Sequence, residues 1–265
     1  MHSRIYEALQ QLGEEVGAVA RGLLGVVGLF YDTLAAAVSP GRGGYRSLLK
    51  QIVGQILFTG VEALWLVGVV GLVTGVTVVL QATDNMPRFG VGDYFGKLLI
   101  LVVVRELGPF VVGLIVSARS GSAFAAYVGG MRVTREIAAL EVMGIEPVHY
   151  LVLPAFWGMV ISVICLNVYF AVIAIGGGLL VAGVTANLPM LISLNKVVQA
   201  LTLSDVWWAL FRGLAFGVIV AIVSGYQGLA VRSIREVPQA ALKSVVYSVA
   251  VMILVNALIT VGINA

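Results

Sequence analysis

The stretch LILVVVRELGPFVVG, residues Leu99 to Gly113, places an arginine beside a glutamate inside an apolar run long enough to enter a lipid bilayer. The whole chain shares this apolar character, since its 265 residues are 60% hydrophobic and 11% charged, with a mean hydropathy of +1.04. Such a composition is typical of a polytopic membrane protein and excludes an ordinary soluble domain. We therefore predict an all-α fold of membrane-spanning helices.

Five apolar windows come close to the roughly 20 residues that a helix needs to cross a bilayer. An odd number of spans places the two chain ends on opposite sides. With the N-terminus inside, the cytoplasmic segments collect most of the Lys and Arg residues, which predicts a cytoplasmic N-terminus and a periplasmic C-terminus. The net charge of +3 is too small to suggest a nucleic-acid partner. The predicted spans are Gln51–Leu80, Leu98–Ser117, Leu153–Val181, Val206–Gly225 and Val245–Ile263.

The first fifty residues form a separate region ahead of the transmembrane domain, which we assign to residues 51–265. The segment IYEALQQLGEEVGAVARGLL spaces its apolar residues as an amphipathic helix does, which predicts a helix lying in the cytoplasmic interface. A signal peptide is the alternative for the apolar run that follows. Asp32 inside that run, and Glu14 and Glu15 before it, oppose this alternative.

Arg105 and Glu106 each need a partner of their own, because neighbouring helical residues point about 100° apart. Each charge costs roughly 3 kcal/mol near the bilayer centre, and such residues mark a function or a polar cavity by default. In the alternative interpretation, Gly108 and Pro109 break the helix, and the charges satisfy freed backbone groups or a neighbouring span. Arg212 lies about two turns into the fourth span, and we predict that its side chain snorkels to the outer surface.

The segment MRVTREIAALEVMGIEP predicts a short amphipathic helix on the cytoplasmic side, at about Met131–Gly144. Thr134 is its candidate N-cap, and Gly144 and Pro147 end it. One interpretation is a helix that rests on the membrane. The other is a coupling helix that fits a groove on a cytosolic partner. The apolar stripe of this helix consists of Ile137, Leu140, Val142 and Met143.

The chain lacks the residues for several enzyme chemistries, so we predict no catalytic residue, metal ligand or cofactor in it. No G-x-x-x-x-G-K-[ST] pattern occurs, which places any ATP hydrolysis in a separate chain. Ser120 and Ser122 lack a base within the spans, because the two histidines and the lysines lie at or beyond the span ends. Two histidines and the single Cys165 are too few for a metal site.

Four spaced motifs carry a resemblance to a known family. RELGP at 105–109, ARSGSA at 118–123, GGMRVTREIAALEVMGIEP at 129–147 and LVLPAFWG at 151–158 resemble the signature region of the MlaE (YrbE) family. These proteins are the permease subunits of ABC lipid transporters that work with MCE-domain proteins in bacterial envelopes. The order of several motifs is stronger than any single one, and the resemblance covers roughly Gln51 to Val181. Ala155, where the family usually has arginine, and the loop 229–243 depart from the pattern.

The resemblance implies a fold and a set of partners. We expect an MlaE-type permease in the bacterial inner membrane that forms a homodimer and works with two cytosolic ATPase subunits, which bind ATP and Mg. An MCE-domain protein on the periplasmic side completes the expected complex, which moves phospholipid between the inner and outer membranes. The resemblance also implies that Glu106 lies near the dimer interface and faces a lipid cavity. Arg105 would there meet a headgroup phosphate or balance the charge around Glu106.

The first span and the cytoplasmic helix supply the other expected site residues. Gly68, Gly71 and Gly75 have the close helical spacing that permits tight contact, either between copies or inside one subunit. The apolar wall expected to face acyl chains consists of Leu72, Val76, Val79 and Leu80, with Gln81 toward its outer end. The residues expected to couple to the ATPase are Met131, Arg132, Arg135, Glu136, Leu140, Glu141 and Gly144.

A different functional class remains open at this point. The chain would be an autonomous secondary transporter or channel that uses Arg105 and Glu106 as a proton or ion relay. Five spans without an inverted repeat, and no further buried acids, make this alternative weaker.

Overall fold

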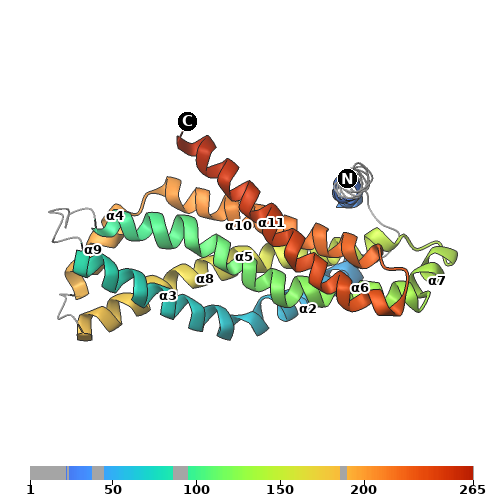
Figure 1. The fold of residues 1–265 in the computed structure, drawn as a ribbon, viewed down its shortest axis with the longest axis horizontal. Coiled ribbons are helices and arrows are strands. Elements are labelled where there is room, and N and C mark those ends of the chain that lie inside the picture. The colour runs from blue at the N-terminus through green and yellow to red at the C-terminus, as the bar shows by residue number, and fades with distance from the viewer. Residues whose placement is uncertain (1–21, 23, 38–44, 86–94, 186–189, 265) are drawn as a thin grey trace, which may run out of the picture.

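The computed structural model describes residues 22, 24–37, 45–85, 95–185 and 190–264. Within these ranges all regular elements are helical and none is a strand, so the predicted all-α fold is confirmed. Figure 1 shows an elongated bundle in which long helices run side by side, with α7 at one end and α4 and α9 at the other.

All five predicted spans are confirmed by helices long and apolar enough to cross a membrane, at Leu48–Thr83, Gly96–Val133, Val148–Val181, Leu203–Leu229 and Ile234–Gly262. The first consists of α2 (Tyr45–Thr59), η1 (Val61–Ala63) and α3 (Leu64–Asn85). The second joins α4 (Phe95–Leu99), η4 (Ile100–Leu107), α5 (Gly108–Val116), η5 (Ser117–Gly121) and α6 (Ser122–Val133). The others are η6 (Val148–Val152) with α8 (Leu153–Thr185), α10 (Leu203–Leu229), and η7 (Ile234–Glu236) with α11 (Val237–Asn264), while α7 (Glu136–Val142) and α9 (Met190–Ala200) are shorter.

The second span does not break at Gly108 and Pro109, so this part of the alternative interpretation is wrong, whereas its other part holds because the charges do pair with a neighbouring span. The segment η4 just before them is a π-helix, in which the N–H of Gly108 bonds to the carbonyl of Val103. Pro109 then occupies the first turn of α5, where its missing N–H removes no bond within α5 itself but gives no donor to the carbonyl of Arg105 in η4. The span continues through a second π-helical segment, η5, and ends at Val133, about four turns beyond the predicted end.

The expected coupling helix is two helices that meet at Arg135. Thr134 is not an N-cap, because it follows the last residue of α6 and its hydroxyl donates to the carbonyl of Gly130 at 3.1 Å. Arg135 adopts a left-handed backbone, with φ of 63°, and α7 starts only after it. Gly144 ends the segment with φ of 74°, as predicted, because glycine adopts this conformation without steric cost.

The helix α8 lies at the centre of the bundle, and glycines bring its neighbours close. A Cβ atom added to Gly75 of α3 would lie 1.9 Å from the carbonyl oxygen of Ala174 in α8. One added to Gly217 of α10 would lie 2.8 Å from the Cα of Val160, also in α8. Such close backbone contact needs residues without side chains at the crossing. These glycines therefore fix the positions of α3 and α10 against one central helix.

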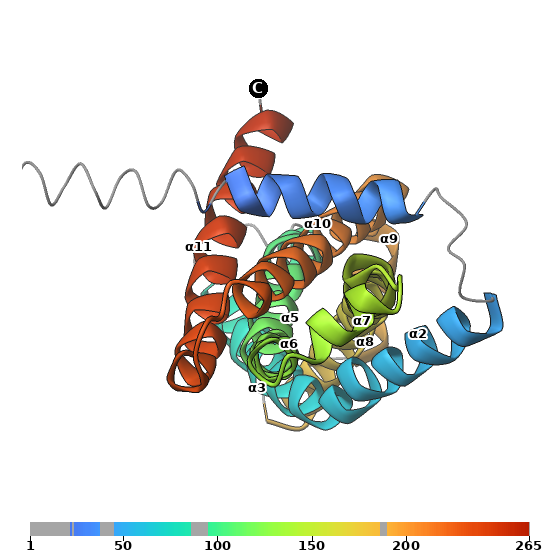
Figure 2. The ribbon, with the colours of Figure 1, turned by 90° about the vertical axis from the view of Figure 1, so that its right-hand side faces the viewer.

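The helix Leu24–Ala37 lies across the bundle near α10, as Figure 2 shows. Its contact face buries Leu29 and Thr33, and a Cβ on Gly225 of α10 would lie 3.5 Å from Leu29. The opposite face exposes apolar residues such as Leu24 and Tyr31, as a helix in a membrane interface does. The predicted amphipathic helix before residue 22 lies outside the described residues.

Candidate functional site

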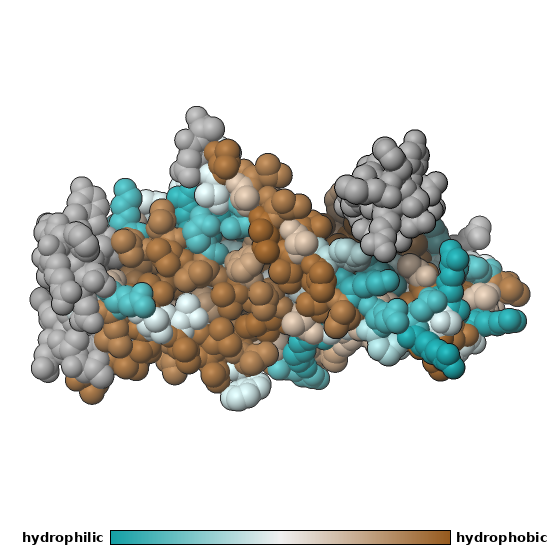
Figure 3. Space-filling model, in the orientation of Figure 1, coloured by the Kyte–Doolittle hydropathy of each residue, from teal (hydrophilic) through white to brown (hydrophobic). Residues whose placement is uncertain are grey.

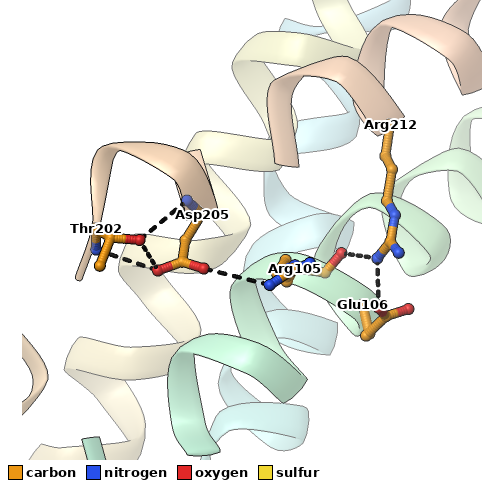
Figure 4. A network of polar contacts seen from close by, with 5 residues as sticks. All are labelled: Arg105, Glu106, Thr202, Asp205 and Arg212. Carbon is orange, nitrogen blue, oxygen red and sulfur yellow. Dashed lines mark hydrogen bonds and ion pairs between the residues drawn. The ribbon is translucent and has the colours of Figure 1, made fainter. Parts of the chain in front are cut away.

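The charged pair of the opening stretch lies in η4, and each member has its own partner on α10, as predicted. Arg105 Nη1 lies 3.6 Å from Asp205 Oδ1, and Glu106 Oε1 lies 2.7 Å from Arg212 Nη1. Figure 4 shows these four side chains and Thr202 as one network between the two spans. Two cations and two carboxylates therefore balance within one small volume of the membrane-spanning region.

Arg212 does not snorkel to the surface, because its side chain is 0% exposed. Its guanidinium pairs with Glu106, donates to the backbone carbonyl of Arg105, and donates to Thr260 Oγ1 of α11 at 2.9 Å. The prediction relied on depth along the helix, which does not say which face the side chain occupies. A planar group with five N–H donors can serve three acceptors at once, and this arrangement uses that capacity.

The carbonyl of Arg105 needs an outside donor because of Pro109. In an α-helix this carbonyl would accept from the N–H four residues later, and proline has none. The donor comes instead from Arg212 of another span. Freed backbone groups within a membrane must be satisfied by neighbouring helices, so the proline and the buried arginine form one structural unit.

Asp205 was missed by the sequence analysis, which expected no further buried acid. Its side chain is 17% exposed and forms a capping box with Thr202 at the start of α10. The N–H of Asp205 donates to Thr202 Oγ1 at 3.3 Å, and the N–H of Thr202 donates to Asp205 Oδ2 at 3.1 Å. The other carboxylate oxygen is left to face Arg105. The signal was present as T-x-x-D ahead of an apolar run.

A third helix joins this network through an amide. Asn167 of α8 is buried, and its Nδ2 donates to the carbonyl of Ala209 in α10 at 3.0 Å. The stretch of α10 from Asp205 to Arg212 therefore makes polar contacts to η4, α8 and α11. The first turns of α10 thus contact three other helical segments, and Arg212 in these turns holds Glu106.

The expected lipid-facing residues of α3 do not share one environment. Leu72 is 41% exposed and Gln81 is exposed, whereas Val76 and Leu80 are half-buried. Val79 is 0% exposed and packs against α8 of the same chain. In this conformation Leu72 therefore offers surface to a lipid and Val79 does not.

The three glycines of α3 face α8 within one chain. A Cβ on Gly71 would lie 3.2 Å from Phe170, and one on Gly68 would lie 2.7 Å from the hydroxyl of Tyr169. Together with Gly75, they place a continuous glycine face against the central helix. The structure thus uses this spacing for packing inside one subunit.

The expected ATPase-coupling residues gather at the end of the bundle that carries α6 and α7. Figure 3 shows hydrophilic residues concentrated at this end, while apolar residues cover most of the visible length of the bundle. Ile137 of the predicted stripe is buried, but Val142 is 89% and Met143 64% exposed, so part of the stripe faces outward. Arg132, Arg135, Glu136, Glu141 and Gly144 are exposed, and Met131 and Leu140 are half-buried.

A second arginine with several partners lies where α2 ends. Arg119 of η5 donates from Nη1 to the carbonyl of Phe58 at 2.8 Å, and its Nη2 pairs with Glu62. The guanidinium also lies 5.2 Å from the centre of the Phe58 ring. The sequence analysis quoted Arg119 within ARSGSA and gave it no partner. This cluster ties the second span to the turn between α2 and α3.

Comparison with known proteins places this network in a family. The family described as Permease MlaE matches residues 52–262, a range that holds all of the network. The chain belongs to the MlaE permease family. It is 32% identical over 239 residues to a probable ABC transporter permease protein of Rickettsia typhi, which covers 89% of this chain and 90% of that protein.

Two further relatives carry names that refer to lipids. The intermembrane phospholipid transport system permease protein MlaE of Haemophilus influenzae is 35% identical over 141 residues, covering 53% of this chain and 54% of that protein. The chloroplastic protein TRIGALACTOSYLDIACYLGLYCEROL 1 of Arabidopsis thaliana is 26% identical over 184 residues, covering 69% and 51%. The resemblance found in the four motifs is thereby confirmed, and the chain is a multi-pass membrane permease.

Proposed function

We propose that this chain is the membrane-spanning subunit of an ABC transporter that moves phospholipid between the inner and outer membranes of a bacterium. The observation that carries the proposal is the charge network around Glu106, set inside spans that match the MlaE permease family. Charged residues at this depth are expensive and mark function by default. The name of the Haemophilus relative supports phospholipid as the cargo.

The lipid site lies between two copies of the chain in this proposal. Glu106 supports this placement because its side chain keeps 33% exposure while the cation that holds it is fully buried. Leu72 and Val73 of α3 are exposed and apolar, which suits acyl chains. Contacts of this kind are mainly apolar, so selectivity among acyl chains should be loose.

Separate ATPase subunits supply the energy, and they bind ATP and Mg, because this chain carries no phosphate-binding loop. Their contact surface is the end of the bundle that carries α6 and α7. The exposed Glu136 and Glu141, with the exposed apolar Val142, suit a groove that takes a short amphipathic helix. ATP-driven approach of the ATPases would push on α7 and tilt the second and third spans, which flank it.

We place the end with α6 and α7 on the cytoplasmic side, because Arg132, Arg135, Arg232, Arg235 and Lys243 belong to the loop and helix ends there. Cytoplasmic segments carry the excess of basic residues in membrane proteins. In this orientation the chain lies in the inner membrane with α4 and α9 toward the periplasm. An MCE-domain protein on that side receives or delivers the lipid.

The test is affinity purification of the tagged chain in mild detergent, followed by mass spectrometry of its bound proteins and lipids. Recovery of an ATPase, an MCE-domain protein and stoichiometric phospholipid is the expected result. Recovery of the folded chain alone and free of lipid would contradict the proposal and favour an autonomous transporter or channel.

A further inference from the structure

The last part of α11 has little packing to hold it in place. From Ile253 to Gly262 no described residue is buried, whereas Met252, just before this stretch, is 0% exposed. Figure 1 shows the same end of α11 diverging from the other helices toward the C-terminus. We call residues 253–262 the α11 tail. Its half-buried face consists of Val255, Asn256, Ile259 and Thr260, and the other residues of the tail are exposed.

A polar contact reaches the tail from the charge network. Arg212 Nη2 donates to Thr260 Oγ1 at 2.9 Å, while Nη1 of the same guanidinium holds Glu106 and the carbonyl of Arg105. Thr260 also donates to the carbonyl of Asn256 at 2.9 Å, so its hydroxyl both accepts and donates. One rigid planar group thus joins three helical segments: η4, α10 and the α11 tail.

We propose that Arg212 is a positioning residue that holds the α11 tail and the Glu106 carboxylate in register with each other. Because the guanidinium is planar and fully buried, a shift of the tail that keeps the Thr260 bond must move or rotate the group that binds Glu106. The position of the fifth span and the position of the charge on the second span are therefore coupled. This inference extends the proposed function. The transport measurement described below rests on the proposed function, and the spectroscopic measurements do not.

The coupling is tested with spin labels in the full-length chain in lipid nanodiscs. Cys165 is exposed and would take a label, so it is first replaced by serine. A nitroxide at Leu258, which is 71% exposed on the tail, reports the mobility of that segment. A second labelled chain carries the nitroxide at Leu242, which is 69% exposed near the start of α11 and serves as the control position.

Thr260→Val removes the bond with little change in shape, and we expect the label at Leu258 to lose its immobilised spectral component. The label at Leu242 should stay unchanged. Thr260→Ser keeps a hydroxyl and should restore the parent spectrum. Asn256→Leu is the matched control, because Asn256 lies one turn earlier and its Oδ1 is buried without a hydrogen-bond partner. Arg212→Met should reproduce the effect of Thr260→Val, provided that it folds.

Parent-like spectra at Leu258 in Thr260→Val would overturn the proposal, and so would an equal loss of immobilisation in Asn256→Leu. Lipid transport by the reconstituted complex gives the second measurement, in which Thr260→Val should be impaired and Thr260→Ser normal. The spectra do not depend on the cargo. A parent chain that moves no phospholipid but shows the expected spectra would therefore contradict the proposed function alone.

Discussion

Arg212 and Arg119 make the same kind of contact in two very different places. Arg212 pairs with Glu106 and donates to the carbonyl of Arg105, and Arg119 pairs with Glu62 and donates to the carbonyl of Phe58. Both carbonyls lie where a helix is irregular, either just before Pro109 or in the last turn of α2. The Arg212 side chain is 0% exposed, whereas that of Arg119 is 29% exposed.

The comparison separates two effects of an arginine at a helix irregularity. The arginine donates to a free backbone carbonyl, and it pairs with a nearby carboxylate. Both positions need a donor for a carbonyl that the helix no longer serves, and a guanidinium supplies it along with a charge for a nearby carboxylate. Only Arg212 is cut off from solvent, so only there does losing the carboxylate partner leave a fully buried charge. The exposed cluster keeps access to solvent or lipid headgroups, so losing one partner costs much less.

Of the substitutions around Arg212 and Arg119, Arg212→Met should cause the largest loss of stability. The change removes the donor of three acceptors, each worth about 0.5–1.5 kcal/mol and up to about 3 kcal/mol for the Glu106 carboxylate, so the expected loss is about 3–5 kcal/mol. Thermal unfolding of the detergent-solubilised protein measures the loss. Adding Glu106→Gln removes the stranded charge and should recover part of the stability. A double variant no more stable than the single one would show that the ion pair is not the main term.

Glu106→Gln alone should affect transport more than folding. The amide oxygen still accepts a hydrogen bond from Arg212, but the fully buried guanidinium loses its counter-charge, so the expected loss of stability is about 2–3 kcal/mol, below that of Arg212→Met. The negative charge near the proposed lipid site is gone, however, and phospholipid transport in reconstituted vesicles should fall to a small fraction of the parent rate. Glu62→Gln is the matched control from the exposed cluster and should transport normally. Equal transport by the two variants would remove the role assigned to Glu106.

The sequence predicted the spans and the need for partners because both follow from local rules. A window of apolar residues long enough to cross a bilayer is a property of the window itself. The side chains of adjacent residues on a helix point about 100° apart, whatever surrounds them. The stop at Gly144, two residues after α7, was likewise predictable, since only glycine takes a left-handed backbone there at no cost.

The partners themselves depend on contacts across the fold. Arg212 lies at a depth from which snorkelling is possible, and only the packing of α10 against η4 and α11 shows that it points inward. The helix continues past Pro109 through a π-helical segment, and Arg212 serves the carbonyl of Arg105, but neither feature is visible in a short window. Thr134 was mistaken for a cap because Arg135 takes a left-handed backbone, which is uncommon for a residue with a side chain.

Asp205→Ala should have an intermediate effect, because Asp205 is half-buried and serves two purposes. It closes the capping box at the start of α10 and faces Arg105 at 3.6 Å. We expect a loss of about 1–2 kcal/mol, measured by thermal unfolding. Thr202→Ala disrupts the cap and leaves the ion pair. The difference between the two variants therefore gives the contribution of the Arg105–Asp205 ion pair to the free energy of unfolding. A Thr202→Ala loss equal to that of Asp205→Ala would leave the ion pair with no measurable weight.

Arg119→Met should have the smallest effect, and it decides whether burial explains the comparison. An exposed ion pair contributes about 0–1 kcal/mol, and the contact with the Phe58 ring adds about 0.5–1 kcal/mol. The loss should also shrink as salt is raised, because exposed charges are screened, whereas the loss in Arg212→Met should not. If Arg119→Met proved as costly as Arg212→Met at high salt, the carbonyl bond at the helix irregularity would carry the energy. Burial of the charge would then not account for the difference between the two arginines.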